Sequence, residues 1–120
     1  MRVKLFAFLG VFLVVSPAAA EDVRVRNDDD TPIFQLFAWP SDLMASTENL
    51  IVVPIESGEI KTVSVDNDWS DCKFTFLVDP NDPDDLRKAS YIKKDMYINV
   101  INICHRNGKP ISLKDVDPNL

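Results

Sequence analysis

The sequence predicts an all-β protein: a small antiparallel β-sandwich of the Ig/C2-like kind, with about seven short strands and one disulfide. Short apolar runs recur at intervals of about eight to twelve residues, which is the spacing of strands in a sandwich. Clusters of Asn, Asp and Pro separate these runs and supply the turns, since the chain has only three glycines. No apolar pattern continues for the length of an ordinary helix.

The first half of the chain holds four of the predicted strands. The run 23–26 alternates apolar and polar residues, and 60–65 forms another such run after a Glu-Ser-Gly turn. Between them, 33–39 carries apolar residues on both faces, as an inner strand does, and a proline ends it. The run 50–55 contains Pro54, so it predicts a short edge strand at best.

The second half of the chain continues the pattern. Residues 72–78 alternate, with aromatic side chains toward one face, and 96–104 alternate in the same way. The run 86–92 predicts a strand with a charged side. A short edge strand is expected at 111–113, inside a polar C-terminal tail that covers about residues 106–120.

Residues 1–20 have the layout of a secretory signal peptide, with a basic start, an apolar stretch and small residues before the cleavage point. Ala18 and Ala20 form the A-x-A pattern, and the apolar run 5–15 is about half the roughly 20 residues that a membrane-spanning helix needs. We therefore expect an exported protein, periplasmic or extracellular, with no membrane insertion after cleavage. The mature chain, 21–120, has the size of a single β-rich domain.

The charge of the chain limits its partners. The predicted signal holds two of the 13 basic residues and none of the 19 acidic ones, which leaves 11 against 19 and a net charge of −8. Nucleic acids and anionic membrane surfaces require a cationic surface, so we expect neither as a partner. A cationic protein is the partner that this charge permits.

The two cysteines, Cys72 and Cys104, predict a disulfide, because exported proteins fold in an oxidising compartment. The bridge would close a loop of about 33 residues and contribute about 3 to 4 kcal/mol in the loop-entropy account. A redox or metal-binding thiol pair is the alternative. The spacing is far from C-x-x-C and the chain has a single histidine, which favours the disulfide.

Two acidic loops, 66–71 and 79–85, raise the question of a calcium site. The EF-hand template fails in both, since neither loop has glycine at the sixth position. A looser site built from both loops is the alternative, with calcium as its cofactor. Asp-Pro and Asn-Asp-Pro are also turn sequences, and consecutive loops fall at opposite ends of a sheet, which favours turns. The candidate ligands are Asp66, Asp68, Asp71, Asp79, Asp82 and Asp84.

The sequence carries no recognisable active site. A catalytic triad needs a nucleophile beside a histidine that an acid orients. The single histidine, His105, directly follows Cys104, which we expect to be bridged. No G-x-S-x-G, HExxH, Walker or GxGxxG motif is present. We therefore predict no catalytic residues and no enzyme.

The two tryptophans are candidates for contact with a partner. Trp39 lies in an apolar run and is expected in the core. Trp69 lies in a loop of aspartates and is expected on the surface. Trp69 is therefore the predicted partner-contact residue.

Five segments between residues 23 and 78 follow one another in a recognisable order. They are Val23-x-Val25-x-Asn27, Thr31-x-Ile33-x-x-Leu36-Phe37-Ala38-x-Pro40-Ser41, Asp42-Leu43-Met44, Ile55-x-x-Gly58-x-x-x-x-Val63-x-Val65-Asp66 and Asp71-Cys72-Lys73-Phe74. This order resembles a group of small exported proteobacterial proteins of unknown function. That group has a V-x-N-x-T-G-x-x-I-x-x-L-Y-x-S-P opening, a D-x-L segment, a P-x-G turn, a T-V-x-V strand and C-x-[YF]-D-L.

The resemblance implies a β-rich secreted domain without known enzyme activity, and it supplies no functional residues. Two positions depart from the pattern. Pro32 stands where the group has glycine, and the second cysteine of the group falls near Asp95 or Met96, whereas here it is Cys104.

Taken together, the sequence predicts an exported, non-enzymatic β-sandwich that acts as a binding or interaction module. The first alternative is a calcium-binding module that uses loops 66–71 and 79–85. The second alternative is an acidic inhibitor of a cationic secreted enzyme such as lysozyme, because small periplasmic inhibitors of that kind share this size and charge.

Overall fold

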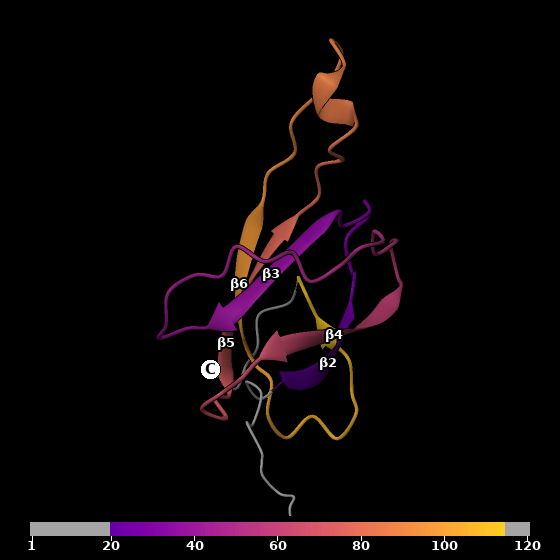
Figure 1. The fold of residues 1–120 in the computed structure, drawn as a ribbon. Helices are drawn as coiled ribbons and strands as arrows, with labels where there is room; N and C mark the ends of the chain where they lie inside the picture. The colour runs from indigo at the N-terminus through magenta and orange to yellow at the C-terminus, as the bar shows by residue number, and fades with distance from the viewer. Residues whose placement is uncertain (1–19, 115–120) are drawn as a thin grey trace, which may run out of the picture.

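The protein is all-β, as the sequence predicts, and its strands form two sheets (Figure 1). Each of the two sheets has three strands. A computed structural model describes residues 20–114. The predicted signal peptide lies outside the described residues except for Ala20, and so do residues 115–120.

Each sheet has a central strand with one neighbour on either side. In the first sheet the order is β4 (Ile60–Asp66), β2 (Ala20–Arg26), β7 (Ile111–Ser112). In the second sheet the order is β3 (Gln35–Pro40), β5 (Lys73–Asp79), β6 (Tyr97–Asn102). Neighbouring strands are antiparallel except β2 and β7, which are parallel.

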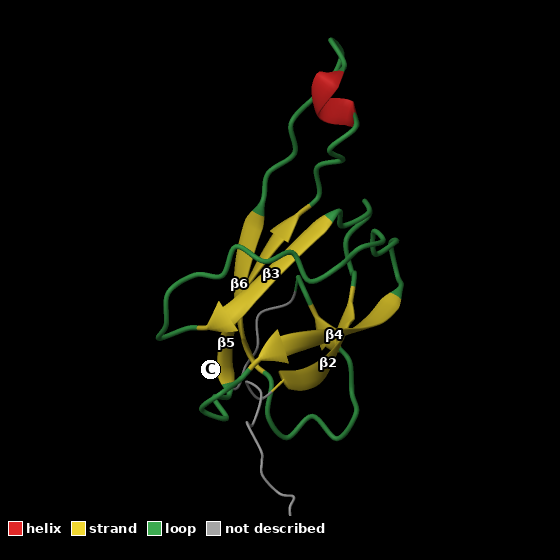
Figure 2. Ribbon diagram, in the orientation of Figure 1, coloured by secondary structure: helices red, strands yellow, loops and turns green. Residues whose placement is uncertain are grey.

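Two of the predicted runs, 50–55 and 86–92, do not form strands, and the described chain has six strands. The run 50–55 makes only a single bridge, between Ile33 and Ile55. The run 86–92 lies in a projecting arm, which we define as residues 82–93, and contains only the 3-10 turn Asp85–Arg87 (Figure 2). No strand pairs with the arm within residues 20–114, and most of its side chains are exposed. Local sequence pattern therefore does not yield a strand there, because sheet stability depends on cross-strand partners.

The core lies between the inner faces of the two sheets. Alternate residues of β2, β4 and β5 are buried, as expected from the period of two in a strand. Aromatic side chains fill the centre, where Phe74 and Phe76 are both fully buried and their ring centroids lie 6.5 Å apart. The other buried apolar residues include Val23, Val25, Leu36, Val63, Val65, Val78 and Ile101.

The chain beyond β6 returns to the core instead of forming a tail from residue 106. Ile111 and Leu113 are buried, and the Leu113 amide donates to the Arg26 carbonyl over 3.1 Å. The predicted edge strand at 111–113 is confirmed as β7.

The predicted disulfide is confirmed. Cys72 and Cys104 are bonded, with their Cα atoms 5.1 Å apart. Cys72 directly precedes β5 and Cys104 follows β6, and these two strands are antiparallel neighbours. The Ile103 amide donates to the Cys72 carbonyl over 2.8 Å, so the bridge closes the same end of the strand pair.

Three buried asparagines, Asn27, Asn67 and Asn81, each follow a strand within two residues. The Asn27 side chain donates to the carbonyls of Thr31 and Ile55, both over 2.9 Å, and accepts from the Asp29 amide over 2.9 Å. Asn27 thereby joins the end of β2 to two loops that are far apart in sequence.

Asn81 does the same at the base of the arm. Its side chain donates to the Asp79 carboxylate and the Lys94 carbonyl, and accepts from the Lys94 amide over 2.7 Å. The Tyr91 hydroxyl also donates to the Asn81 side chain. The two legs of the arm are therefore joined where they leave the sheet (Figure 1).

Tyr97 points into the core from β6. Within residues 20–114, its hydroxyl is the buried side-chain oxygen that has no hydrogen-bond partner. Burial raises the pKa of Tyr97 to about 12, and the nearby Asp29 and Asp28 carboxylates add to the effect.

We expect Asn27→Ala to lower the free energy of unfolding by about 2–4 kcal/mol, because it removes three hydrogen bonds that a buried side chain makes to the backbone of Asp29, Thr31 and Ile55. Chemical denaturation measures this loss. Gln35→Ala is the matched control, since the Gln35 amide makes no side-chain hydrogen bond within the described chain; it should change stability by less than about 1 kcal/mol. Equal losses in the two variants would contradict the role of Asn27.

We expect Tyr97→Phe to be at least as stable as the wild type at neutral pH, because the deleted hydroxyl has no partner. The folded-state pKa of Tyr97 lies above the ordinary value of 10.0. The stability that the neutral phenol contributes is therefore complete below pH 10 and is lost as the pH rises toward about 12. Unfolding free energies measured against pH should show this loss in the wild type and a smaller one in Tyr97→Phe. Phenolate absorbance from Tyr97 near pH 10 would sink the argument.

Candidate functional site

A groove of about 350 Å³ lies where the two sheets present their edges to each other. β3 is an edge strand of one sheet and β4 is an edge strand of the other. The chain between β3 and β4 lines one side of the groove, and the loop after β4 lines the end. The apolar lining is Ala38, Trp39, Pro40, Leu43, Met44 and Leu50, with Trp69 from the loop.

The groove brings the two tryptophans to one site. Trp69 is 77% exposed, in agreement with its predicted place on the surface. The prediction that Trp39 lies in the core is wrong, because it is only partly buried and lines the groove. Leu36 and Ala38 occupy the core-facing side of β3, so the alternation of the strand turns Trp39 to the opposite face.

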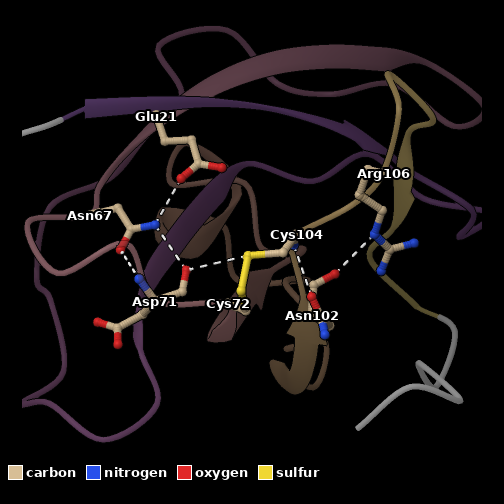
Figure 3. Close-up of a disulfide and its surroundings, with 7 residues drawn as sticks. All are labelled: Glu21, Asn67, Asp71, Cys72, Asn102, Cys104 and Arg106. Atoms are coloured by element: carbon tan, nitrogen blue, oxygen red, sulfur yellow. Dashed lines mark hydrogen bonds between the residues drawn. A yellow bond between two sulfur atoms is a disulfide. The ribbon is translucent and has the colours of Figure 1, made fainter.

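The loop that carries Trp69 is organised by Asn67 (Figure 3). The Asn67 amide nitrogen donates to the Glu21 carboxylate over 2.8 Å and to the Asp71 carbonyl over 2.9 Å. The amide oxygen accepts from the Asp71 backbone N–H over 2.7 Å. Ser70 takes a positive φ of 54°, which closes the loop tightly between these bonds.

The disulfide fixes the far side of the same loop (Figure 3). Cys72 directly follows Asp71, and the Cys104 sulfur lies 4.0 Å from the Asp71 carbonyl oxygen. Trp69 is therefore carried on a short segment that Asn67 holds at one end and the bridge holds at the other. A binding side chain on such a segment loses little freedom when a partner binds.

Three carboxylates, those of Glu48, Asp66 and Asp68, border the apolar lining. Glu48 comes from the chain before Leu50, whereas Asp66 and Asp68 come from the end of β4 and the loop after it. Two indole rings beside three carboxylates make a surface that suits a cation with an apolar stem.

The outer face of the second sheet is also apolar near the groove. Register places Phe37 beside Leu77 and Leu77 beside Ile98, in one row across β3, β5 and β6. Trp39 begins the next row, which ends at Val100. Ile98 is 58% exposed. Trp39 therefore connects the groove to an apolar stripe on the solvent side of the sheet.

Sequence reasoning identified Trp69 but not its neighbours in the groove. Leu43, Met44 and Glu48 belong to a segment without regular structure, and no local pattern shows where such a segment packs. One feature of the sequence did point to this surface: residues 33–39 carry apolar side chains on both faces of the strand. A strand with one face in water needs apolar side chains on the other face alone.

The structure divides the six candidate calcium ligands into two separate groups. Asp66, Asp68 and Asp71 lie before β5, and Asp79 begins the second group at the other end of that strand. β5 spans seven residues, so the groups lie about 20 Å apart along it. Within residues 20–114, no three His, Cys, Asp or Glu side chains are grouped so that they could hold a metal ion.

The segment 80–86, which follows β5, is held by side-chain bonds of the kind that close turns. The Asp79 carboxylate accepts from the Asn81 backbone N–H over 2.9 Å, and the Asp82 carboxylate accepts from the Asp84 backbone N–H over 2.9 Å. These are side chains that close turns by bonding the backbone two residues ahead.

His105 is exposed in the turn after β6, with a positive φ of 60°. Cys104 beside it is bonded to Cys72, so it offers no thiol as a nucleophile. Across residues 20–114, no helix is long and apolar enough to cross a membrane.

We expect millimolar calcium to leave the melting temperature unchanged relative to EDTA, because the two acidic groups are far apart. An ion that binds the folded state must raise the melting temperature by linkage. A clear rise would restore the calcium site. The paired variants Asp66→Asn with Asp68→Asn, and Asp79→Asn with Asp82→Asn, would then show which loop binds.

Comparison with known proteins finds no similarity that identifies the chain: no protein-family model, no curated protein and no solved structure matches it.

Proposed function

We propose that the protein is an exported, non-enzymatic binding module that holds a cationic protein segment in the groove between Trp39 and Trp69. The observation that carries the proposal is the meeting of two indole rings and three carboxylates in one groove. The resemblance to small exported proteobacterial proteins agrees with this proposal and stays a prediction.

The chemistry of the groove favours a lysine or arginine side chain. An indole face attracts a cation by about 0.5–2 kcal/mol, depending on how far the pair is desolvated. The carboxylates of Glu48, Asp66 and Asp68 add attraction that salt weakens, since exposed charges are screened over about 10 Å at 0.1 M ionic strength. Aromatic anchors commonly carry most of the binding energy of a protein interface.

Export is supported by the disulfide, because such bonds persist in oxidising compartments. It also follows from the predicted signal peptide, residues 1–20. The net charge of −6 for the whole chain suits a cationic partner and disfavours nucleic acid.

Inhibition of a cationic secreted enzyme such as lysozyme is the narrower form of the same proposal. The acidic groove favours it over the calcium alternative, for which the structure offers two separated acidic groups. A lysozyme activity assay with and without the protein separates an inhibitor from a general binding module.

The test uses two synthetic peptides, one alternating lysine with valine and one alternating glutamate with valine. We expect the lysine peptide to change the fluorescence of the groove tryptophans and to bind more weakly as salt is raised. The glutamate peptide should not bind. Trp69→Ala should weaken binding of the lysine peptide by about tenfold, the effect of removing one interface anchor.

Ile92→Ala is the matched control, because Ile92 is 82% exposed and lies in the arm, away from the residues that line the groove. It should leave the affinity unchanged. Equal affinity for the two peptides, or equal effects of the two substitutions, would refute the groove as the binding site.

A further inference from the structure

The backbone of β3 presents unpaired groups to the groove at Ala38. In an antiparallel strand, the N–H and C=O groups of alternate residues point to opposite edges. The Ser41 amide donates to the Lys73 carbonyl on β5, so the odd-numbered residues of β3 face β5. Leu36 and Ala38 therefore direct their backbone groups to the other edge.

Within residues 20–114, the rest of the chain pairs with this edge on either side of Ala38, at Leu36 and at the Pro40 carbonyl, which accepts from the Leu43 amide over 2.9 Å. The Leu50 amide donates to the Leu36 carbonyl over 2.7 Å, and the Leu36 amide donates to the Asn49 side chain over 2.9 Å. At Ala38, neither the N–H nor the C=O has a backbone partner on this edge within residues 20–114. Ala38 itself lines the groove.

A single free pair of backbone groups at an edge strand is a template for another strand. We propose that the groove binds its partner by strand addition, with one residue of an extended cationic segment exchanging both backbone hydrogen bonds with Ala38. This inference rests on the proposed function and specifies how the partner binds.

The side chains around Ala38 determine which residues the added strand needs. A residue directly opposite Ala38 points to the same face of the sheet as Ala38. The groove that Ala38 lines is bordered by the carboxylates of Glu48, Asp66 and Asp68, so a basic side chain is favoured there. The residues before and after it point to the outer face, beside Trp39 and the stripe at Phe37, so apolar side chains are favoured.

The partner is therefore a segment that alternates basic and apolar residues. A second copy of this chain is a poorer occupant, because two chains of net charge −6 repel each other.

The test methylates backbone nitrogens of the lysine–valine peptide, with the wild-type protein unchanged. In the proposed complex the lysine amides face Ala38 and the valine amides face away. We expect methylation of the lysine nitrogens to weaken binding by about tenfold or more, since it removes a bond and crowds the edge. Methylation of the valine nitrogens should leave the affinity near that of the parent peptide.

The outcomes separate this inference from the proposed function. If both methylated peptides bind like the parent, or both weaken equally, strand addition is wrong. The groove proposal still stands in that case, provided that Trp69→Ala weakens the parent peptide. If the parent peptide does not bind at all, both proposals are wrong.

A protein variant gives a second measurement. Ala38→Pro deletes the N–H that faces the groove and removes no bond to β5, because proline is tolerated where the N–H faces an open edge. We expect the parent peptide to bind several-fold more weakly to this variant. The disulfide and a cooperative melt serve as the check of folding, and unchanged affinity in a folded variant would overturn the role of Ala38.

Discussion

The fold depends on satisfying the backbone of its loops with buried side-chain amides. The chain has few glycines and long connections, so its loops cannot close by backbone freedom alone. Asn27, Asn67 and Asn81 supply donors and acceptors at the points where three strands end. A side-chain amide carries both a donor and an acceptor. One asparagine can therefore form hydrogen bonds with the backbone of the loop that follows it and with the backbone of a segment distant in sequence. The ends of the strands determine where the loops start, and the hydrogen bonds of these three asparagines determine the path that each loop follows.

The groove is a consequence of the same arrangement. Part of the groove lining comes from the strands β3 and β4, whereas Trp69 and Asp68 come from a loop that Asn67 and the disulfide hold in place. Rigid loops of this kind combine the variability of a connection with the precision of a sheet. Within residues 20–114 the two edge strands do not pair with each other, which leaves an apolar lining and, at Ala38, one pair of backbone groups without a backbone partner. In the binding role that we propose, the specificity of the groove would come from its shape, its charge and the direction of its hydrogen bonds.

Much of the fold follows from the sequence, and the site follows only in part. The alternation in Lys73–Asp79 and Ile60–Asp66 identifies two strands, because one face of each is buried. The pairing of Cys72 with Cys104 needs only the compartment and the count. The strand predicted at 86–92 was wrong, because the apolar residues of this run resemble a strand but lie in the arm. Within residues 20–114, no other strand pairs with the arm. The groove could not be predicted, because the position of Met44 or Glu48 depends on packing between segments distant in sequence.

The arm also has a consequence for how the protein can be altered. Asn81 joins its two legs at the base, so the part beyond is a loop whose ends already lie together. The cost of lengthening such a loop grows only slowly with the number of residues added. Residues 82–93 are therefore the natural place to insert an epitope or a fluorescent label, or to open the chain for circular permutation. The sandwich and the groove would keep their geometry while the arm carries the new sequence.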